Sequence, residues 1–146
     1  MKIGIANDHR GFEHNKKIAN ILEELGYEVI NYGPKELDNE DDYPDFAFKV
    51  GEAIKNKEID RGILICRTGI GISIACNKVK GIRCARVCSK EDAELSRIDN
   101  NANVITLSYE LGENEIKEII EAFLETEFSD HPRHARRVSK IDNYDN

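Results

Sequence analysis

A cysteine followed by a glycine-rich turn is the segment of this 146-residue sequence best suited to chemistry. Residues 66–71 read Cys-Arg-Thr-Gly-Ile-Gly and come directly after the apolar run 62–66. Two glycines permit a sharp turn, so that successive backbone N–H groups can point into one concavity beside a helix N-terminus and bind an oxyanion. Such a field also lowers the pKa of a thiol and favours thiolate, a base or nucleophile. A buried structural cysteine is the alternative, but the turn and the strand end favour a functional Cys66.

Two familiar uses of such a turn are excluded by the residues within and after it. A dinucleotide-binding fingerprint needs G-x-G-x-x-G after the first strand, whereas the third glycine position here is Ile74. A cysteine phosphatase loop needs the pattern Cys, five residues, Arg, and position 72 is Ile. The segment therefore predicts neither a nucleotide site nor a phosphatase.

Three further groups of residues could carry chemistry. Asp8 and His9 follow the first apolar run, and adjacent titratable groups there are more suggestive than a lone capping or solvated residue. Arg133 and Arg137 have i,i+4 spacing, so on a helix both guanidiniums could bind one phosphate, although a solvated basic tail would have the same spacing. The pair His131-x-x-His134 has no third ligand in view, so we expect no metal.

The hydrophobic pattern alternates between strand-like and helix-like periods along the chain. Strands are expected at residues 2–6, 27–32, 62–66, 83–88 and 103–107. Helices are expected at residues 12–25, 44–56, 70–78, 89–99 and 116–124, before a basic tail. Parallel neighbours need helical crossovers, so this order predicts an α/β fold: a doubly wound, Rossmann-like, five-stranded parallel sheet with a C-terminal helical tail. Ligands bind such sheets at the carboxyl ends of the strands.

Composition narrows the class of protein. Residues 1–146 suit a single domain, and an apolar fraction of 40% with 34% charged residues excludes collagen-like and disordered classes. A net charge of −7 argues against nucleic acid, and no apolar run reaches the ~20 residues of a membrane span. The first residues begin a strand pattern without a signal-peptide core, so we expect a cytoplasmic protein with reduced thiols.

The motifs taken together resemble those of the type B ribose-5-phosphate isomerases, a family that also holds galactose-6-phosphate and allose-6-phosphate isomerases. The resemblance covers essentially the whole chain. The motifs that carry it stand in the family's order and spacing: Asp8-His9, Asp42-Tyr43-Pro44-Asp45, the run 62–71, Ala75-x-Asn77-Lys78, Gly81-Ile-Arg83, Leu95-Ser96-Arg97, Asn100-x-Ala-Asn103-Val104 and Arg133-His134-x-x-Arg137-Val138.

This resemblance implies an aldose–ketose isomerase of the pentose phosphate pathway, an intramolecular oxidoreductase that uses no metal, nucleotide or other cofactor. Cys66 would move a proton between C1 and C2 of a substrate of the ribose 5-phosphate/ribulose 5-phosphate type. Thr68 and the backbone N–H groups of residues 67–71 would hold the oxygens of the cis-enediolate. Arg133 and Arg137 would bind phosphate from a neighbouring subunit, since family members are dimers or tetramers with sites at the interface. The other implied substrate contacts are Asp8, His9, Tyr43, Arg67, Gly69, Ile70, Gly71 and Asn100.

Three positions depart from the family's pattern. Asp99 stands where the family usually has the histidine that opens the sugar ring, Arg67 replaces a glycine, and Glu110 lies in a shortened segment that usually carries an arginine. These departures predict a preferred substrate that differs from ribose 5-phosphate. It would be either non-cyclic, such as erythrulose 4-phosphate, or opened through Asp99 acting as a catalytic residue.

Other functions stay open at this point. Six-carbon galactose or allose 6-phosphate is an alternative substrate, and the sequence leaves chain length, stereochemistry and dimer versus tetramer undecided. A non-catalytic sugar-phosphate sensor is favoured by the missing histidine and arginine but would have no use for Cys66. No motif supports a flavodoxin-like nucleotide or flavin binder.

Overall fold

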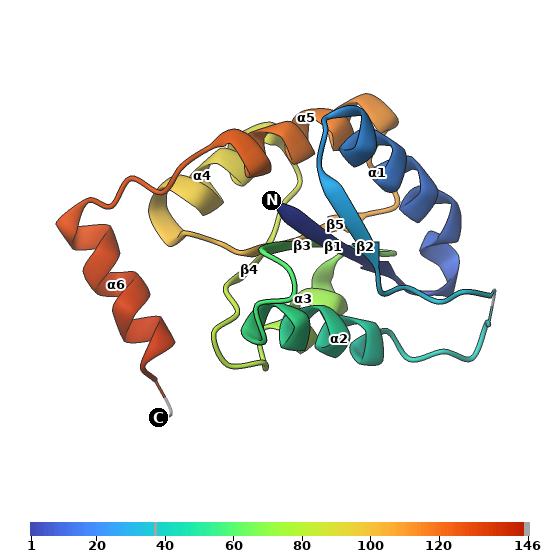
Figure 1. Ribbon diagram of the computed structural model, residues 1–146, viewed down its shortest axis with the longest axis horizontal. Helices are drawn as coiled ribbons and strands as arrows, with labels where there is room; N and C mark the ends of the chain where they lie inside the picture. Colours follow the sequence, from blue (N-terminus) through green and yellow to red (C-terminus); the bar gives the residue numbers. More distant parts are fainter. Residues whose placement is uncertain (37, 145–146) are drawn as a thin grey trace.

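Five parallel strands form one sheet in the order β2-β1-β3-β5-β4 (Figure 1). The structure is a computed structural model, and it describes residues 1–36 and 38–144. The strands are β1 (Lys2–Asn7), β2 (Glu28–Asn31), β3 (Arg61–Cys66), β4 (Cys84–Arg86) and β5 (Val104–Ser108). The predicted α/β fold with a five-stranded parallel sheet is therefore confirmed.

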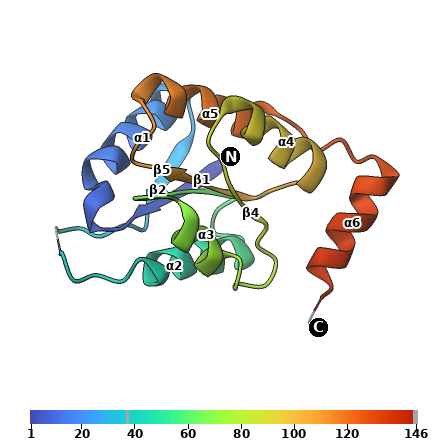
Figure 2. The same cartoon turned by 180° about the vertical axis from the view of Figure 1, so that it is seen from behind.

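Helices cover both faces of this sheet (Figures 1 and 2). One face carries α1 (Phe12–Glu24), α4 (Lys90–Asn100) and α5 (Glu113–Glu125), and the other carries α2 (Tyr43–Lys55) and α3 (Ile70–Cys76). A 3₁₀ turn, η1 (His9–Gly11), precedes α1. The last helix, α6 (Pro132–Asp142), lies to one side of the three layers and is the predicted helical tail.

Alternation along the strands divides the core into two apolar clusters. On β3, Ile63 and Ile65 pack with α1 and α5, whereas Leu64 and Cys66 pack with α2 and α3. Successive side chains of a strand point to opposite faces of the sheet, so one continuous apolar run supplies both clusters. The Cys66 side chain therefore lies on the face covered by α2 and α3.

Several element boundaries differ from those expected. The fourth strand spans three residues rather than 83–88, because Val87 and the residues after it already lead into α4, whose N-cap hydroxyl, Ser89 Oγ, accepts the Asp92 N–H at 3.1 Å. The third helix ends at Cys76 rather than at residue 78. The next residue, Asn77, instead bonds to β4 through its side chain, which donates to the Cys84 carbonyl and accepts from the Cys84 N–H.

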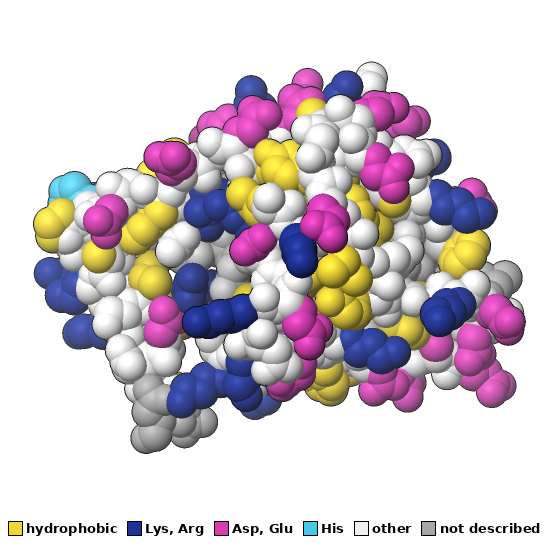
Figure 3. Space-filling view, viewed as in Figure 1, with side chains coloured by type: hydrophobic (Ala, Val, Ile, Leu, Met, Phe, Trp, Pro, Cys, Tyr) yellow, Lys and Arg dark blue, Asp and Glu magenta, His cyan; other side chains and the backbone are white. Residues whose placement is uncertain are grey.

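The surface around α6 is rich in cationic side chains. A hollow of about 590 Å³ separates the loop before β4 from the end of α6, and Lys78, Lys80 and Lys140 contribute to its lining. Figure 3 shows Lys and Arg side chains gathered at this end of the molecule. Among the described residues, no helix is both long and apolar enough to cross a bilayer.

Candidate active site

The sheet reverses its winding direction between β1 and β3, and this is where a doubly wound sheet opens a crevice for ligands. The two strands are neighbours with Asn7 opposite Ile65, so the residues after them, Asp8 and Cys66, emerge side by side. The structure thus brings together the segments that begin at Asp8 and at Cys66, in both of which the sequence predicted functional residues.

Cys66 is the last residue of β3 and is buried at this edge of the sheet, where the residue is only 6% exposed. Its Sγ accepts a hydrogen bond from the Gly69 N–H at 3.2 Å. Gly69 has φ +76°, and a Cβ there would approach the Leu107 backbone to 3.2 Å, so glycine is required on both counts. This hydrogen bond places an N–H dipole against the sulfur at the start of the turn.

The expected helix N-terminus contributes less than the sequence suggested. Helix α3 has only 7 residues, so its dipole is short. The turn itself supplies the orientation: Thr68 Oγ1 accepts the Ile70 N–H at 3.1 Å, which leaves the Thr68 hydroxyl proton free for a ligand oxygen. Gly71 packs closely against the Tyr43 ring: a Cβ added at Gly71 would lie only 2.7 Å from Tyr43 Oη. Tyr43 therefore closes one side of the turn.

Asp8 and His9 follow β1 at the same edge of the sheet. Asp8 Oδ1 accepts the N–H groups of Arg10 and Gly11, each at 3.1 Å, so this carboxylate caps η1. Burial raises the pKa of Asp8, and the hydrogen bond from Gly11 opposes that rise. His9 Nδ1 lies 3.0 Å from Asp41 Oδ1. A carboxylate only accepts, so Nδ1 carries the proton and Nε2 remains available to a ligand.

Asp41 is a site residue that the sequence reasoning missed. Its side chain is 8% exposed, and its Oδ2 is buried with no hydrogen-bond partner among the described residues. It lies in an acidic loop far from His9 in the sequence, and no spacing rule connects the two.

Asp99 and Asn100 lie at the opposite end of the sheet. They end α4, just before β5 begins at Val104, which is opposite Gly62, whereas Cys66 is opposite Ser108. Four residues of strand separate these levels, roughly 13 Å at ~3.3 Å per residue. The structure therefore does not bring these two residues to Cys66 within one chain.

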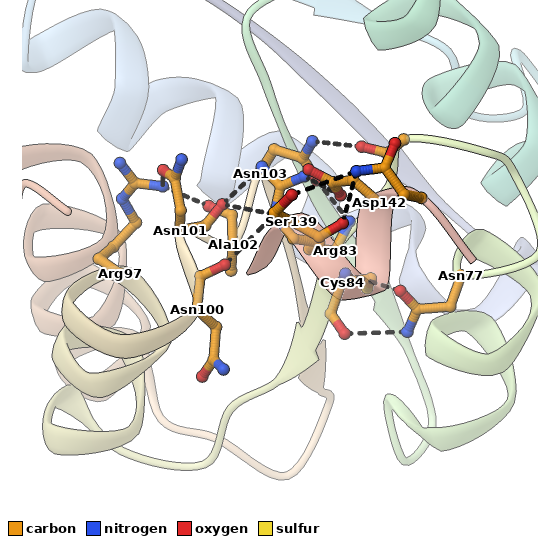
Figure 4. Close-up of polar contacts among 12 residues, drawn as sticks. Asn77, Arg83, Cys84, Arg97, Asn100, Asn101, Ala102, Asn103, Ser139 and Asp142 are labelled. Atoms are coloured by element: carbon orange, nitrogen blue, oxygen red, sulfur yellow. Dashed lines mark hydrogen bonds and ion pairs between the residues drawn. The ribbon is translucent and has the colours of Figure 1, made fainter. Parts of the chain in front are cut away.

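A polar cluster around Arg83 joins this end of α4 to α6 (Figure 4). The Arg83 guanidinium donates to the Asn100 and Asn101 carbonyls at 3.0–3.2 Å and to Asp142 Oδ1 at 2.7 Å. A second contact places His134 Nε2 3.7 Å from Asp99 Oδ1, which is an ion pair when the imidazole is protonated. The start of α6 is therefore held beside the end of α4, and its end is held by Arg83 in the segment before β4.

Helix α6 carries the expected phosphate-binding arginines. Arg133 and Arg137 are both exposed and lie one turn apart on it, as the i,i+4 spacing predicted. His131 caps the helix by accepting the Arg133 N–H at 3.3 Å. Within residues 1–36 and 38–144, no three His, Cys, Asp or Glu side chains are grouped as a metal site.

Comparisons with known proteins agree with this architecture. The family model "Ribose/Galactose Isomerase" matches residues 3–141. A putative sugar phosphate isomerase of Bacillus subtilis is 42% identical over 146 residues, covering 99% of this chain and 97% of its own length.

Two solved structures are similar throughout. Ribose-5-phosphate isomerase B of Clostridium thermocellum is 47% identical with a TM-score of 0.93, and 97% of this chain and 95% of that one are covered. The same enzyme of Mycoplasma genitalium, solved with bound ribulose-5-phosphate, is 43% identical with a TM-score of 0.92, and the coverage is 98% and 95%. The fold and these matches together place the chain in the ribose/galactose isomerase family.

Proposed function

We propose that this protein is an aldose–ketose isomerase that interconverts a sugar phosphate of the ribose 5-phosphate/ribulose 5-phosphate type. The observation that carries this function is the Cys66 thiol at the end of a buried strand, with the Gly69 N–H 3.2 Å from its sulfur. The substrate class is supported by the relatives named ribose-5-phosphate isomerase B and by the Mycoplasma genitalium structure with ribulose-5-phosphate.

The reaction moves one proton between neighbouring carbons. The Cys66 thiolate removes the proton from C2 of the open-chain aldose and returns a proton to C1, while the O2 hydroxyl proton passes to O1 across the cis-enediolate, so that C2 becomes the carbonyl carbon and the thiolate is regenerated. Charge develops on the sugar oxygens in the enediolate between these steps. The Thr68 hydroxyl and backbone N–H groups of residues 67–71 stabilise that charge. The Gly71 N–H donates to neither side chain of the turn, whereas the Gly69 and Ile70 N–H groups donate to Cys66 Sγ and Thr68 Oγ1 and would exchange these acceptors for sugar oxygens.

The crevice around the turn supplies the sugar contacts. Asp8 and His9 face it from β1, Tyr43 from the start of α2, and Arg67 from the turn itself. Asp41 fixes the tautomer of His9, so that Nε2 can accept a proton from a sugar hydroxyl.

The complete site needs a second copy of the chain. The phosphate arginines, Arg133 and Arg137, and the sugar contact Asn100 belong to the α4–α6 end, which is roughly 13 Å of strand away from Cys66 in the same chain. In a homodimer or tetramer, the α4–α6 end of one subunit completes the Cys66 crevice of its neighbour. Asp99, at the same end, then opens the sugar ring.

A coupled assay over four- to six-carbon aldose and ketose phosphates tests this function. Cys66→Ala should lower kcat by about 10²–10⁴, the contribution of a general base, and leave KM nearly unchanged. Cys88→Ala is the matched control, because Cys88 is an exposed thiol that the mechanism does not use. If Cys66→Ala still exchanges the C1/C2 proton with solvent at the native rate, Cys66 is not the base.

A further inference from the structure

The carbonyl groups of the turn after Cys66 are each held by a side chain. Ser108 Oγ donates to the Arg67 carbonyl at 2.7 Å, Arg86 Nε to the Thr68 carbonyl at 2.9 Å, and Thr106 Oγ1 to the Gly69 carbonyl at 2.7 Å. Three successive peptide planes are thereby fixed from outside the turn. None of the three donors is among the site residues described above.

The strand register explains why these donors can reach the turn. Arg86 is opposite Thr106, which is opposite Leu64, and Ser108 is opposite Cys66. Residues opposite each other in parallel strands place their side chains on one face of the sheet. All three donors therefore lie on the α2–α3 face, where the chain turns after Cys66.

The peptide between Thr68 and Gly69 differs from its neighbours. Its carbonyl accepts from the Arg86 guanidinium, and its N–H donates to Cys66 Sγ. In a trans peptide the C=O and N–H groups point in opposite directions within one plane, so holding one aims the other. A cation bonded to the carbonyl also polarises the N–H, because hydrogen bonds in a chain strengthen one another.

We propose that Arg86 is a positioning residue for the isomerase: its guanidinium orients and polarises the Thr68–Gly69 peptide, and that peptide's N–H stabilises the Cys66 thiolate. The inference rests on the proposed function only in taking that thiolate as the base. Arg86 touches neither sulfur nor sugar, so its effect passes through the peptide.

Direct action of the Arg86 charge through solvent is the competing explanation. Arg86 is exposed, and exposed charges are screened by water and salt. Of the charged side chains in the described residues, Arg86 alone donates a hydrogen bond to a carbonyl of residues 66–69. Other charged or titratable groups at this edge lie on the turn, beyond β1 and in α1, in the acidic loop, at the start of α2 and beyond β5: Arg67, Asp8, His9, Arg10, His14, Asp41, Tyr43, Tyr109 and Glu110.

The alkylation rate of Cys66 reports how readily its sulfur reacts as a thiolate, and the measurement needs no substrate. Iodoacetamide reacts with thiolate, and trypsin releases Cys66 alone in residues 62–67, so mass spectrometry follows this thiol separately from the other three. Arg86→Leu should slow alkylation at pH 7 by about fivefold, the scale of one charge-assisted hydrogen bond acting through a peptide.

Two further variants separate the hydrogen bond from the charge. Arg86→Lys keeps a charged donor and should restore most of the native rate, whereas Arg86→Gln keeps a neutral donor, should give an intermediate rate and replaces the leucine variant if that fails to fold. Lys90→Gln removes an exposed cation four residues further along the chain, whose partner is Glu94, and should change nothing. In the isomerase assay, Arg86→Leu should lower kcat at pH 7 with KM unchanged.

Three results would overturn the inference. The first is native alkylation of Arg86→Leu at pH 7, and the second is an equal slowing by Lys90→Gln, which would indicate a general field. The third is a raised KM with unchanged kcat, which would make Arg86 a substrate ligand. A failure of the proposed function would look different. Cys66→Ala would then retain activity, while the alkylation rates of the Arg86 variants would still follow the expected order.

Discussion

The two halves of the candidate site are built in opposite ways. The turn after Cys66 has its carbonyls bonded to side chains of β4 and β5, and its backbone packs against Leu107. Helix α6 buries only Val138 and is held at its two ends by ion pairs to Arg83 and Asp99. In the proposed mechanism, the half that stabilises a developing charge is rigid within one chain, whereas the half with the proposed phosphate arginines is held loosely enough to adapt to the neighbouring subunit that the proposal requires.

Mixing two inactive variants tests the largest consequence of this division. Cys66→Ala removes the proposed base, and Arg137→Ala removes a proposed phosphate ligand, so each alone should be nearly inactive. In a mixed dimer, one of the two sites inherits both intact halves. Random reassortment should therefore recover about a quarter of native activity, because half of the dimers are mixed and one of their two sites is complete.

A double variant supplies the control for this experiment. Cys66→Ala mixed with Cys66→Ala/Arg137→Ala contains no intact crevice and should stay inactive. A monomer in light scattering at assay concentration, or no recovery after reassortment, would show that the arginines do not act across an interface.

The rigid half could largely be predicted from the sequence, because its determinants are local. An apolar run followed by Cys-x-Thr-Gly-x-Gly fixes a strand, a turn and the residue at their junction. The donors to the turn could not be found in the same way. Arg86 is an exposed arginine on a short edge strand, and only the register of β4 on β5 brings it to the Thr68 carbonyl.

The position of Asp99 could have been inferred from topology. A helix that crosses between parallel strands runs back toward their amino ends, so the last residues of the helix expected at 89–99 must lie away from the carboxyl edge. The pairing of His9 with Asp41 is different, since it depends on the path of the acidic loop and no periodic pattern encodes that path.

Replacing Gly69 by alanine in the turn after Cys66 should lower kcat by an intermediate amount. Gly69→Ala places a Cβ at φ +76° and 3.2 Å from the Leu107 backbone, so the Gly69 N–H must turn away from Cys66. We expect kcat to fall by about 10²-fold to 10³-fold, the size of losing one donor to a charge in the reaction. The measurement is kcat and KM on ribose 5-phosphate, with KM expected to change little.

Gly26→Ala is the matched control for strain. Its φ is +88°, and a Cβ there would meet nothing within 4 Å. It should cost about 1 kcal/mol of unfolding free energy and leave kcat unchanged. Equal losses of kcat in both variants would mean that general destabilisation, and not the turn, explains the effect of Gly69→Ala.

The smallest effect is expected at Asp99, which lies in the half of the site next to α6 and bears on which sugar phosphate the enzyme prefers. An ionised carboxylate can take a hydroxyl proton from a ring form but is a poor acid at pH 7. Ribose 5-phosphate must be opened before its C2 proton can move, whereas a four-carbon ketose phosphate such as erythrulose 4-phosphate cannot close a stable ring. Asp99→Asn should therefore lower kcat/KM on ribose 5-phosphate by about five- to tenfold and spare the four-carbon substrate.

The Asp99 carboxylate also pairs with His134, so the same substitution loosens α6, and a second variant must separate the two roles. His134→Gln breaks the ion pair but keeps the carboxylate. A role confined to holding α6 predicts that both variants weaken both substrates alike, through KM, because the phosphate arginines move. A ring-opening role predicts that only Asp99→Asn discriminates between the substrates, and it does so through kcat on ribose 5-phosphate. If ribose 5-phosphate is the better substrate and Asp99→Asn is harmless, the aspartate at this position is neutral and the ring opens by another route.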